Sequence, residues 1–128
     1  MKIEQEFEKW AILPACINKA QATLGATIIE GAEDDDDRDE MDDYAMSEEN
    51  GVAIIPVHGV IGHKVSAIAK MLGAVDTLDV IAAIELAAED DEIDTIILDV
   101  DSPGGTVGGV PELAETVEEV QKSRRKKI

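Results

Sequence analysis

The spacing of apolar positions predicts two β-strands in the second half of the chain. Residues 52–57, VAIIPV, are almost continuously apolar and predict a first strand, in which Pro56 indicates an edge position or a bulge. Residues 93–100, IDTIILDV, hold a β-branched run that predicts a strand covered on both faces. Both strands are short, as is typical of an α/β protein.

Two helices are predicted around the second strand. Apolar residues recur at helical spacing within 80–88, and Asp76 or Thr77 offers an N-cap for this helix. A second helical period follows the second strand, with Pro111 tolerated in its first turn; its apolar positions are Val110, Leu113, Ala114, Val117 and Val120. The order strand, helix, strand, helix favours a parallel sheet joined by a right-handed crossover.

The sequence DSPGG, residues 101–105, predicts a sharp turn after the second strand. Pro103 fixes its own φ and biases Ser102 away from helical backbone, while Gly104 and Gly105 permit conformations closed to other residues. A strand, a glycine turn and a helix start would present bare backbone N–H groups, which is the geometry of an oxyanion or phosphate hole. A turn with no functional role explains the two glycines equally well. The turn lacks the Lys-Ser/Thr of a P-loop and the G-x-G-x-x-G spacing of a dinucleotide site.

The first half of the chain is divided by an acidic run. Residues 10–13 are apolar and stop at Pro14, and a loose helical period then extends to Ile28. This stretch is either a helix docked on the body of the protein or an unattached arm, with Trp10 as a packing anchor. Residues 33–43, EDDDDRDEMDD, repel one another and predict a disordered linker. We therefore predict an N-terminal arm over 1–32, a linker over 33–50 and a folded domain over 51–128.

Composition excludes several classes of function. The net charge of −18 argues against nucleic acid and anionic membranes as partners. One cysteine, Cys16, and two separated histidines do not make a metal site, and no cofactor is predicted. No apolar run is long enough for a membrane span, and the acidic start does not resemble a signal peptide, so a cytoplasmic location is expected.

Three segments resemble the signal peptide peptidase A family of serine peptidases, and in particular its branch of phage capsid-assembly proteases. They are GVAIIPVHGVIGH at 51–63, DVIAAIELAAEDDEIDTIILDV at 79–100, and IILDVDSPGGTVGGVPELAETV at 96–117. WAILP at 10–14 matches more loosely. The resemblance implies an α/β fold of the Clp protease/crotonase type, a spiral of ββα units that is truncated here after its first units and carries an N-terminal helical arm. The implied setting is the cytoplasm or the phage procapsid.

The resemblance also implies a site. The family uses a Ser–Lys dyad, and its oxyanion hole maps onto Gly104 and Gly105, more specifically Gly105, with Ser102 and Pro103 shaping the turn. The family's nucleophile and base lie further along than Ile128, so no catalytic residue is assigned and the isolated chain is expected to lack peptidase activity.

Other side chains are poor substitutes for the missing dyad. Ser102 is expected to be a turn residue, and the remaining serines are Ser47, Ser66 and Ser123. A Ser–His–Asp triad would need His58 or His63 beside Asp99 or Asp101, with no serine fixed near them. Lys64 and Lys70 are expected to be solvated, although a general-base lysine requires burial.

Two alternatives to a truncated peptidase remain. The first is a non-catalytic interaction protein of the same fold, which would bind capsid or protease subunits or associate with itself. The second is a protein with a crotonase-like acyl-CoA site. The second alternative ranks last because no basic residue near the turn would hold a CoA phosphate. Peptide substrates are expected only of full-length relatives.

Overall fold

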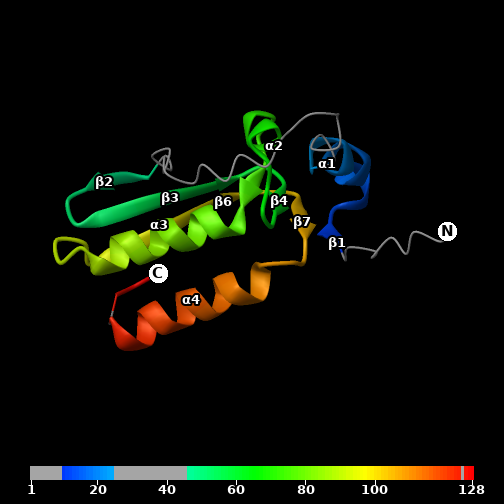
Figure 1. The fold of residues 1–128 in the computed structure, drawn as a ribbon. Coiled ribbons are helices and arrows are strands. Elements are labelled where there is room, and N and C mark those ends of the chain that lie inside the picture. Colours follow the sequence, from blue (N-terminus) through cyan, green and yellow to red (C-terminus); the bar gives the residue numbers. More distant parts are fainter. Residues whose placement is uncertain (1–9, 25–45, 125) are drawn as a thin grey trace.

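The computed structural model describes residues 10–24, 46–124 and 126–128, which form two small sheets flanked by helices (Figure 1). One sheet has the order β2-β3-β6 and the other the order β1-β7-β4-β5. The α/β class predicted from the sequence is confirmed. Residues 1–9 and 25–32 of the predicted arm, and the acidic run 33–43, lie outside the described residues.

The three-stranded sheet is the longer one. β3 (Val52–His58) pairs in parallel with β6 (Thr95–Asp101) along the whole length of both strands. β2 (Ser47–Glu49) pairs antiparallel with the start of β3. Asn50 and Gly51 connect β2 to β3 with positive φ angles of 52° and 78°, as a tight hairpin turn requires. The linker prediction is therefore wrong for Ser47–Glu49, because the Asn-Gly turn folds these residues onto β3.

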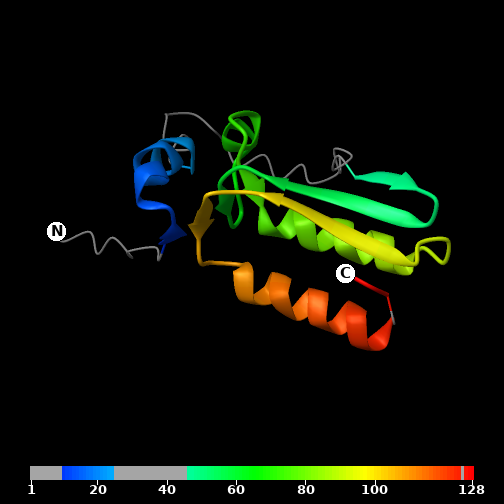
Figure 2. The ribbon, with the colours of Figure 1, turned by 180° about the vertical axis from the view of Figure 1, so that it is seen from behind.

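The four-stranded sheet consists of very short strands gathered at one end of the molecule. Its members are β1 (Trp10–Ile12), β7 (Gly104–Thr106), β4 (Ile61–Gly62) and β5 (Val75–Asp76). β7 lies between β1, which runs antiparallel to it, and β4, which runs parallel to it. The turn that follows β6 thus carries the chain from one sheet into the other (Figures 1 and 2).

Two helices cover one face of the three-stranded sheet. α3 (Thr77–Glu89) crosses from β5 to β6, and α4 (Val110–Ser123) packs beside α3. Asp76 caps α3, as the sequence predicted, and Pro111 lies in the first turn of α4. The core lies between the helices and the sheet; its fully buried larger side chains include Ile55, Ile84, Ile96 and Val80. Leu113, Val117 and Val120 of α4 join this core.

The prediction that β6 is covered on both faces is wrong. Ile96 is buried, but Ile97, on the opposite face of the strand, is 46% exposed. Val100 lies on the same face as Ile96 and is 62% exposed, so the helices leave the end of β6 uncovered. Seen from behind, β3 and β6 lie side by side with α3 beyond them (Figure 2). The helices shield one face only, so the opposite face of β6 is open. Among the described residues, the outer edge of β6 is covered only near Thr95, where Lys127 forms a bridge.

Pro56 lies in the strand that has neighbours on both sides, between β2 and β6. The β2 pairing ends at Ile54, opposite Ser47, and Pro56 lies opposite Asp99 of β6. The predicted edge position is wrong, because β3 is the central strand of its sheet.

Residues 126–128 return to the sheet. The N–H of Ile96 donates to the carbonyl of Lys127 (2.7 Å), and Lys127 forms an isolated parallel bridge with Thr95. The ammonium of Lys126 donates to the carbonyls of Ala87 and Asp90 at the C-terminus of α3. The basic tail thus stabilises the end of α3 and forms one bridge to the outer edge of β6.

Three shorter helical segments complete the described fold. α2 (Ala67–Met71) begins at Ser66, whose hydroxyl accepts the N–H of Ala69 (3.1 Å). η1 (Pro14–Cys16) and α1 (Ile17–Leu24) follow β1. None of the described helices is long and apolar enough to cross a membrane.

Candidate functional site: the glycine turn between the sheets

The turn after β6 is held by one hydroxyl group. Ser102 Oγ donates to the carbonyl oxygen of Gly59 (2.5 Å) and accepts the N–H of Gly104 (3.1 Å). The N–H of Gly59 in turn donates to the carbonyl of Asp101 (2.9 Å). These bonds join the end of β6 to the residue that follows β3, so the turn is built by contacts distant in sequence as well as by its own residues.

The helix that follows the turn begins at Val110, where the sequence predicted it, with Gly109 as its N-cap. Gly104 and Gly105 form β7, a short strand that the sequence did not predict. The hydrogen-bonding needs of the two neighbouring strands draw these residues into the second sheet.

Close approach of neighbouring backbones requires both residues to be glycine. A Cβ atom at Gly104 would lie 2.0 Å from the carbonyl oxygen of Ala11, and Gly104 also has a φ of 107°. A Cβ atom at Gly105 would lie 1.8 Å from the carbonyl oxygen of Ile61. Gly104 therefore admits β1 on one side of β7, and Gly105 admits β4 on the other.

Pro103 contributes its carbonyl group. Its oxygen accepts the N–H of Leu13 (3.0 Å), which extends the pairing of β1 beyond Ile12. Pro103 has no backbone N–H, so the turn needs no acceptor for it. The turn thus contacts the N-terminal segment through main-chain atoms.

For an oxyanion hole, the geometry of the two glycines differs. The N–H of Gly104 is already engaged by Ser102, whereas Gly105 lies in register opposite Ala11. A hole works through donors that are aimed at a developing negative charge. In this structure Gly105 is paired with β1 on one side and with β4 on the other.

The four serines of the sequence analysis are all described, and three have hydrogen-bonded hydroxyls with structural roles. Ser102 holds the turn, Ser66 caps α2, and Ser123 Oγ donates to the carbonyl of Glu119 (2.7 Å). Ser47 is exposed on β2. Among the described residues, no lysine or histidine is hydrogen-bonded to a serine hydroxyl, so no nucleophile–base pair is present there.

The structure brings together one histidine and one aspartate that the sequence considered as triad members. His58 Nε2 lies 2.9 Å from Asp99 Oδ2 on the open face of the three-stranded sheet. The parallel register explains this, because His58 pairs with Asp101 and Pro56 with Asp99. No serine accompanies the pair, which is exposed to solvent.

The second histidine is half-buried beside the start of α4. His63 Nδ1 is 3.0 Å from Thr77 Oγ1 at the start of α3. A Cβ atom at Gly109 would lie 2.4 Å from His63 Nδ1, so Gly109 allows α4 to begin directly against this pair. His63 therefore has a packing role in the described structure.

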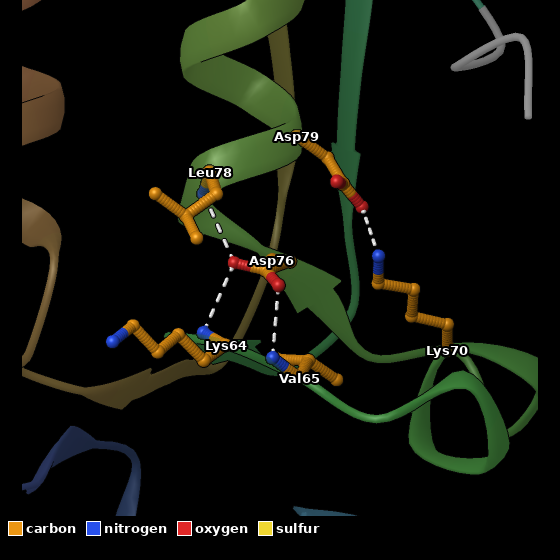
Figure 3. A network of polar contacts seen from close by, with 6 residues as sticks. All are labelled: Lys64, Val65, Lys70, Asp76, Leu78 and Asp79. Carbon is orange, nitrogen blue, oxygen red and sulfur yellow. Dashed lines mark hydrogen bonds and ion pairs between the residues drawn. The ribbon is translucent and has the colours of Figure 1, made fainter. Parts of the chain in front are cut away.

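Sequence reasoning saw Asp76 as a cap but missed the rest of its network (Figure 3). The carboxylate is 4% exposed and accepts three backbone N–H groups, from Lys64 (3.2 Å), Val65 (2.8 Å) and Leu78 (2.9 Å). One side chain thus fixes the loop after β4 to the start of α3. Beside it, Lys70 Nζ and Asp79 Oδ2 form an ion pair at 2.7 Å.

Acidic side chains gather between the two long helices. A hollow of about 230 Å³ runs between the C-terminal halves of α3 and α4 and includes Glu85, Glu89 and Glu119 in its lining. On α4, a hydrogen bond and the charge of Lys122 lower the pKa of Glu118. The described residues contain no cluster of three or more His, Cys, Asp or Glu side chains that could hold a metal ion.

Comparison with known proteins finds that the chain is similar to proteins of two phages, and the predicted resemblance to capsid-assembly proteases is confirmed. It is 32% identical to capsid assembly protease C of Escherichia phage lambda over 102 residues, which are 80% of this chain and 22% of that protein. It is 29% identical to head-tail preconnector protein GP5 of Enterobacteria phage P21 over 68 residues, which are 53% of this chain and 14% of that protein. The chain thus spans less than a quarter of either relative.

No family model matches the chain. No solved structure matches it significantly, so the Clp protease/crotonase-like spiral is not confirmed beyond the α/β class.

Proposed function

We propose that the chain carries the glycine-turn part of a serine peptidase domain of the capsid-assembly protease type, with the Clp protease/crotonase-like fold. In this proposal Gly105 supplies the oxyanion-hole N–H, and Ser102 and Pro103 hold the turn in shape. The similarity to capsid assembly protease C of phage lambda and the Ser102–Gly104 contact support it. Peptide-bond hydrolysis, in capsid or signal-peptide processing, is proposed for full-length relatives.

We further propose that the chain of 128 residues does not hydrolyse peptides by itself. The observation that supports this proposal is the hydrogen bonding of the Ser102 hydroxyl, which belongs to the serine nearest to the two glycines in sequence. Its hydroxyl donates to Gly59 and accepts from Gly104, and neither partner is a base. A serine nucleophile needs a neighbouring group that takes its proton.

Labelling with a fluorophosphonate probe tests this proposal. We expect less than stoichiometric labelling of the intact chain by mass spectrometry, and the same background in Ser102→Ala. Stoichiometric modification of one serine would overturn the proposed inactivity. Hydrolysis of a fluorogenic peptide that survives in Ser102→Ala would point to a nucleophile elsewhere and also contradict it.

A non-catalytic interaction role is the second candidate, and the open edge of β6 favours it. Lys127 pairs beside Thr95, but Val100, further along the strand, is largely exposed. An uncovered strand edge can pair with a strand from another chain, which would be a second copy or a capsid or protease subunit. Co-purification with phage head proteins and a raised unfolding temperature in the complex would support this role. A stable, monodisperse monomer that gains nothing from those proteins would contradict it.

A further inference from the structure

We propose that Asn50 is a site of spontaneous deamidation, and that the isoaspartyl product releases β2 from β3. The reaction uses the backbone of the chain and water, so it needs no enzyme. It takes place in the hairpin turn between β2 and β3, at the end of the three-stranded sheet opposite the glycine turn (Figure 1). The inference is therefore independent of the proposed peptidase function.

The fold favours the dipeptide Asn50-Gly51 at this place. Glu49 pairs with Val52, so the turn has only two residues, and both have positive φ angles, 52° at Asn50 and 78° at Gly51. Asparagine is among the few residues other than glycine that adopt such angles readily. A Cβ atom at Gly51 would also lie 3.1 Å from the carbonyl oxygen of Glu92. The geometry of the turn thus places a glycine directly after an asparagine, which is a chemically labile residue.

Both reacting groups are accessible. Asn50 is exposed, and its side-chain amide makes no hydrogen bond with another described residue. The carbonyl of Gly51 accepts the N–H groups of Asp94 (2.9 Å) and Thr95 (3.3 Å), which holds Gly51 in place, whereas its own N–H donates to no described residue. Glycine has no side chain that would shield this nitrogen from the carboxamide of Asn50.

Deamidation begins when the Gly51 nitrogen attacks Cγ of Asn50 and gives up its proton to hydroxide or water. A C–N bond forms, the side-chain amide of Asn50 leaves as ammonia, and a cyclic succinimide results. Water then opens the ring at one of its two carbonyl groups. Opening at the side-chain carbonyl gives aspartate, and opening at the main-chain carbonyl gives isoaspartate, in which the backbone runs through the former side chain.

The two products affect the hairpin differently. Aspartate keeps the turn, because Asp-Gly also suits a two-residue hairpin. Isoaspartate adds a carbon atom to the backbone, so the turn no longer matches the register of Glu49 with Val52. β2 has only 3 residues, all of them exposed, and little apolar burial opposes its release. Release of β2 uncovers the outer edge of β3 from Val52 to Ile54.

Incubation of the full chain at mildly alkaline pH tests the inference. Peptide mapping by mass spectrometry follows Asn50 together with Asn18, which precedes Lys19 in α1 and serves as the internal control. We expect Asn50 to convert at least about tenfold faster than Asn18, because a lysine side chain hinders attack by its own backbone nitrogen and glycine has none. Labelling by protein isoaspartyl methyltransferase identifies the isoaspartyl product.

Hydrogen exchange then compares the isoaspartyl form, separated by chromatography, with the unmodified chain. The amide hydrogens of residues 47–54 should exchange at least about tenfold faster in the isoaspartyl form. Asn50→Gly is the matched variant, because Gly-Gly suits the same turn but cannot deamidate, so its exchange should stay slow after incubation. Conversion of Asn50 no faster than that of Asn18, conversion to aspartate alone, or unchanged exchange in the isoaspartyl form would overturn the inference. None of these results bears on serine labelling, so the proposed function is tested separately.

Discussion

Gly105 and Ile61 approach so closely that a single methyl group on Gly105 would come within 1.8 Å of the Ile61 carbonyl oxygen. The contact joins β7 to β4, and these are the strands through which the turn is attached to the second sheet. Backbone atoms cannot move aside as a flexible side chain can, so the distance between the strands depends on the absence of a Cβ atom at this position.

Gly105→Ala should therefore separate β7 from β4 and lower the free energy of unfolding by about 3 kcal/mol. Urea denaturation followed by circular dichroism measures the change. Gly108→Ala is the matched control, because a Cβ atom there would meet only His63 Cβ at an ordinary 3.8 Å. Equal stability of the two variants would show that the β4–β7 contact is not rigid.

Ser102→Ala should destabilise the protein by about 1–3 kcal/mol, since the Gly59 carbonyl and the Gly104 N–H lose a half-buried partner. Ser123→Ala removes a hydroxyl from an exposed position on α4 and should change stability by less than about 0.5 kcal/mol. If Ser102→Ala is as mild as Ser123→Ala, the hydroxyl does not hold the turn.

Asp76→Ala should cost about 3 kcal/mol, because one buried carboxylate accepts three backbone N–H groups. The neighbouring Asp79→Ala breaks only a part-exposed ion pair with Lys70, which is worth no more than about 1 kcal/mol. Thermal unfolding of both variants distinguishes the two carboxylates. A loss in Asp79→Ala that equals the loss in Asp76→Ala would contradict the role given to the buried network.

Val100→Lys should suppress self-association without a large change in stability, because Val100 is 62% exposed and a charge blunts an open strand edge. Leu86→Lys introduces the same charge on an exposed position of α3 and should leave association unchanged. Sedimentation velocity over a range of concentrations measures the difference. A parent chain that stays monomeric throughout would argue against β6 as an association edge.

The sequence predicted the strands and helices that are specified by local apolar periodicity. The apolar runs and helical periods gave β3, β6, α3 and α4, and a short side chain before an apolar stretch gave the Asp76 cap. The Asn50-Gly51 turn was also readable, since that dipeptide is a strong hairpin signal, and β2 was missed because the acidic residues nearby indicated a linker.

The site was less predictable because its geometry comes from distant contacts. The need for glycine at 104 and 105 arises from Ala11 and Ile61, and no pattern within the turn reveals either neighbour. Likewise, the exposure of Val100 depends on where α3 and α4 lie, whereas the sequence shows only an apolar run. Strand order and sheet membership are set by packing across the whole chain.

The bond between Ser102 and Gly59 spans 43 positions of sequence, so the turn has its final shape only after β3 and β6 have met. Contacts of such separation form late and slow the folding of small domains. The amide hydrogens of Gly59 and Gly104 donate within this junction, and their exchange with solvent should therefore follow the opening of the parallel sheet. Assembly of the glycine turn and completion of the sheet are then a single cooperative event.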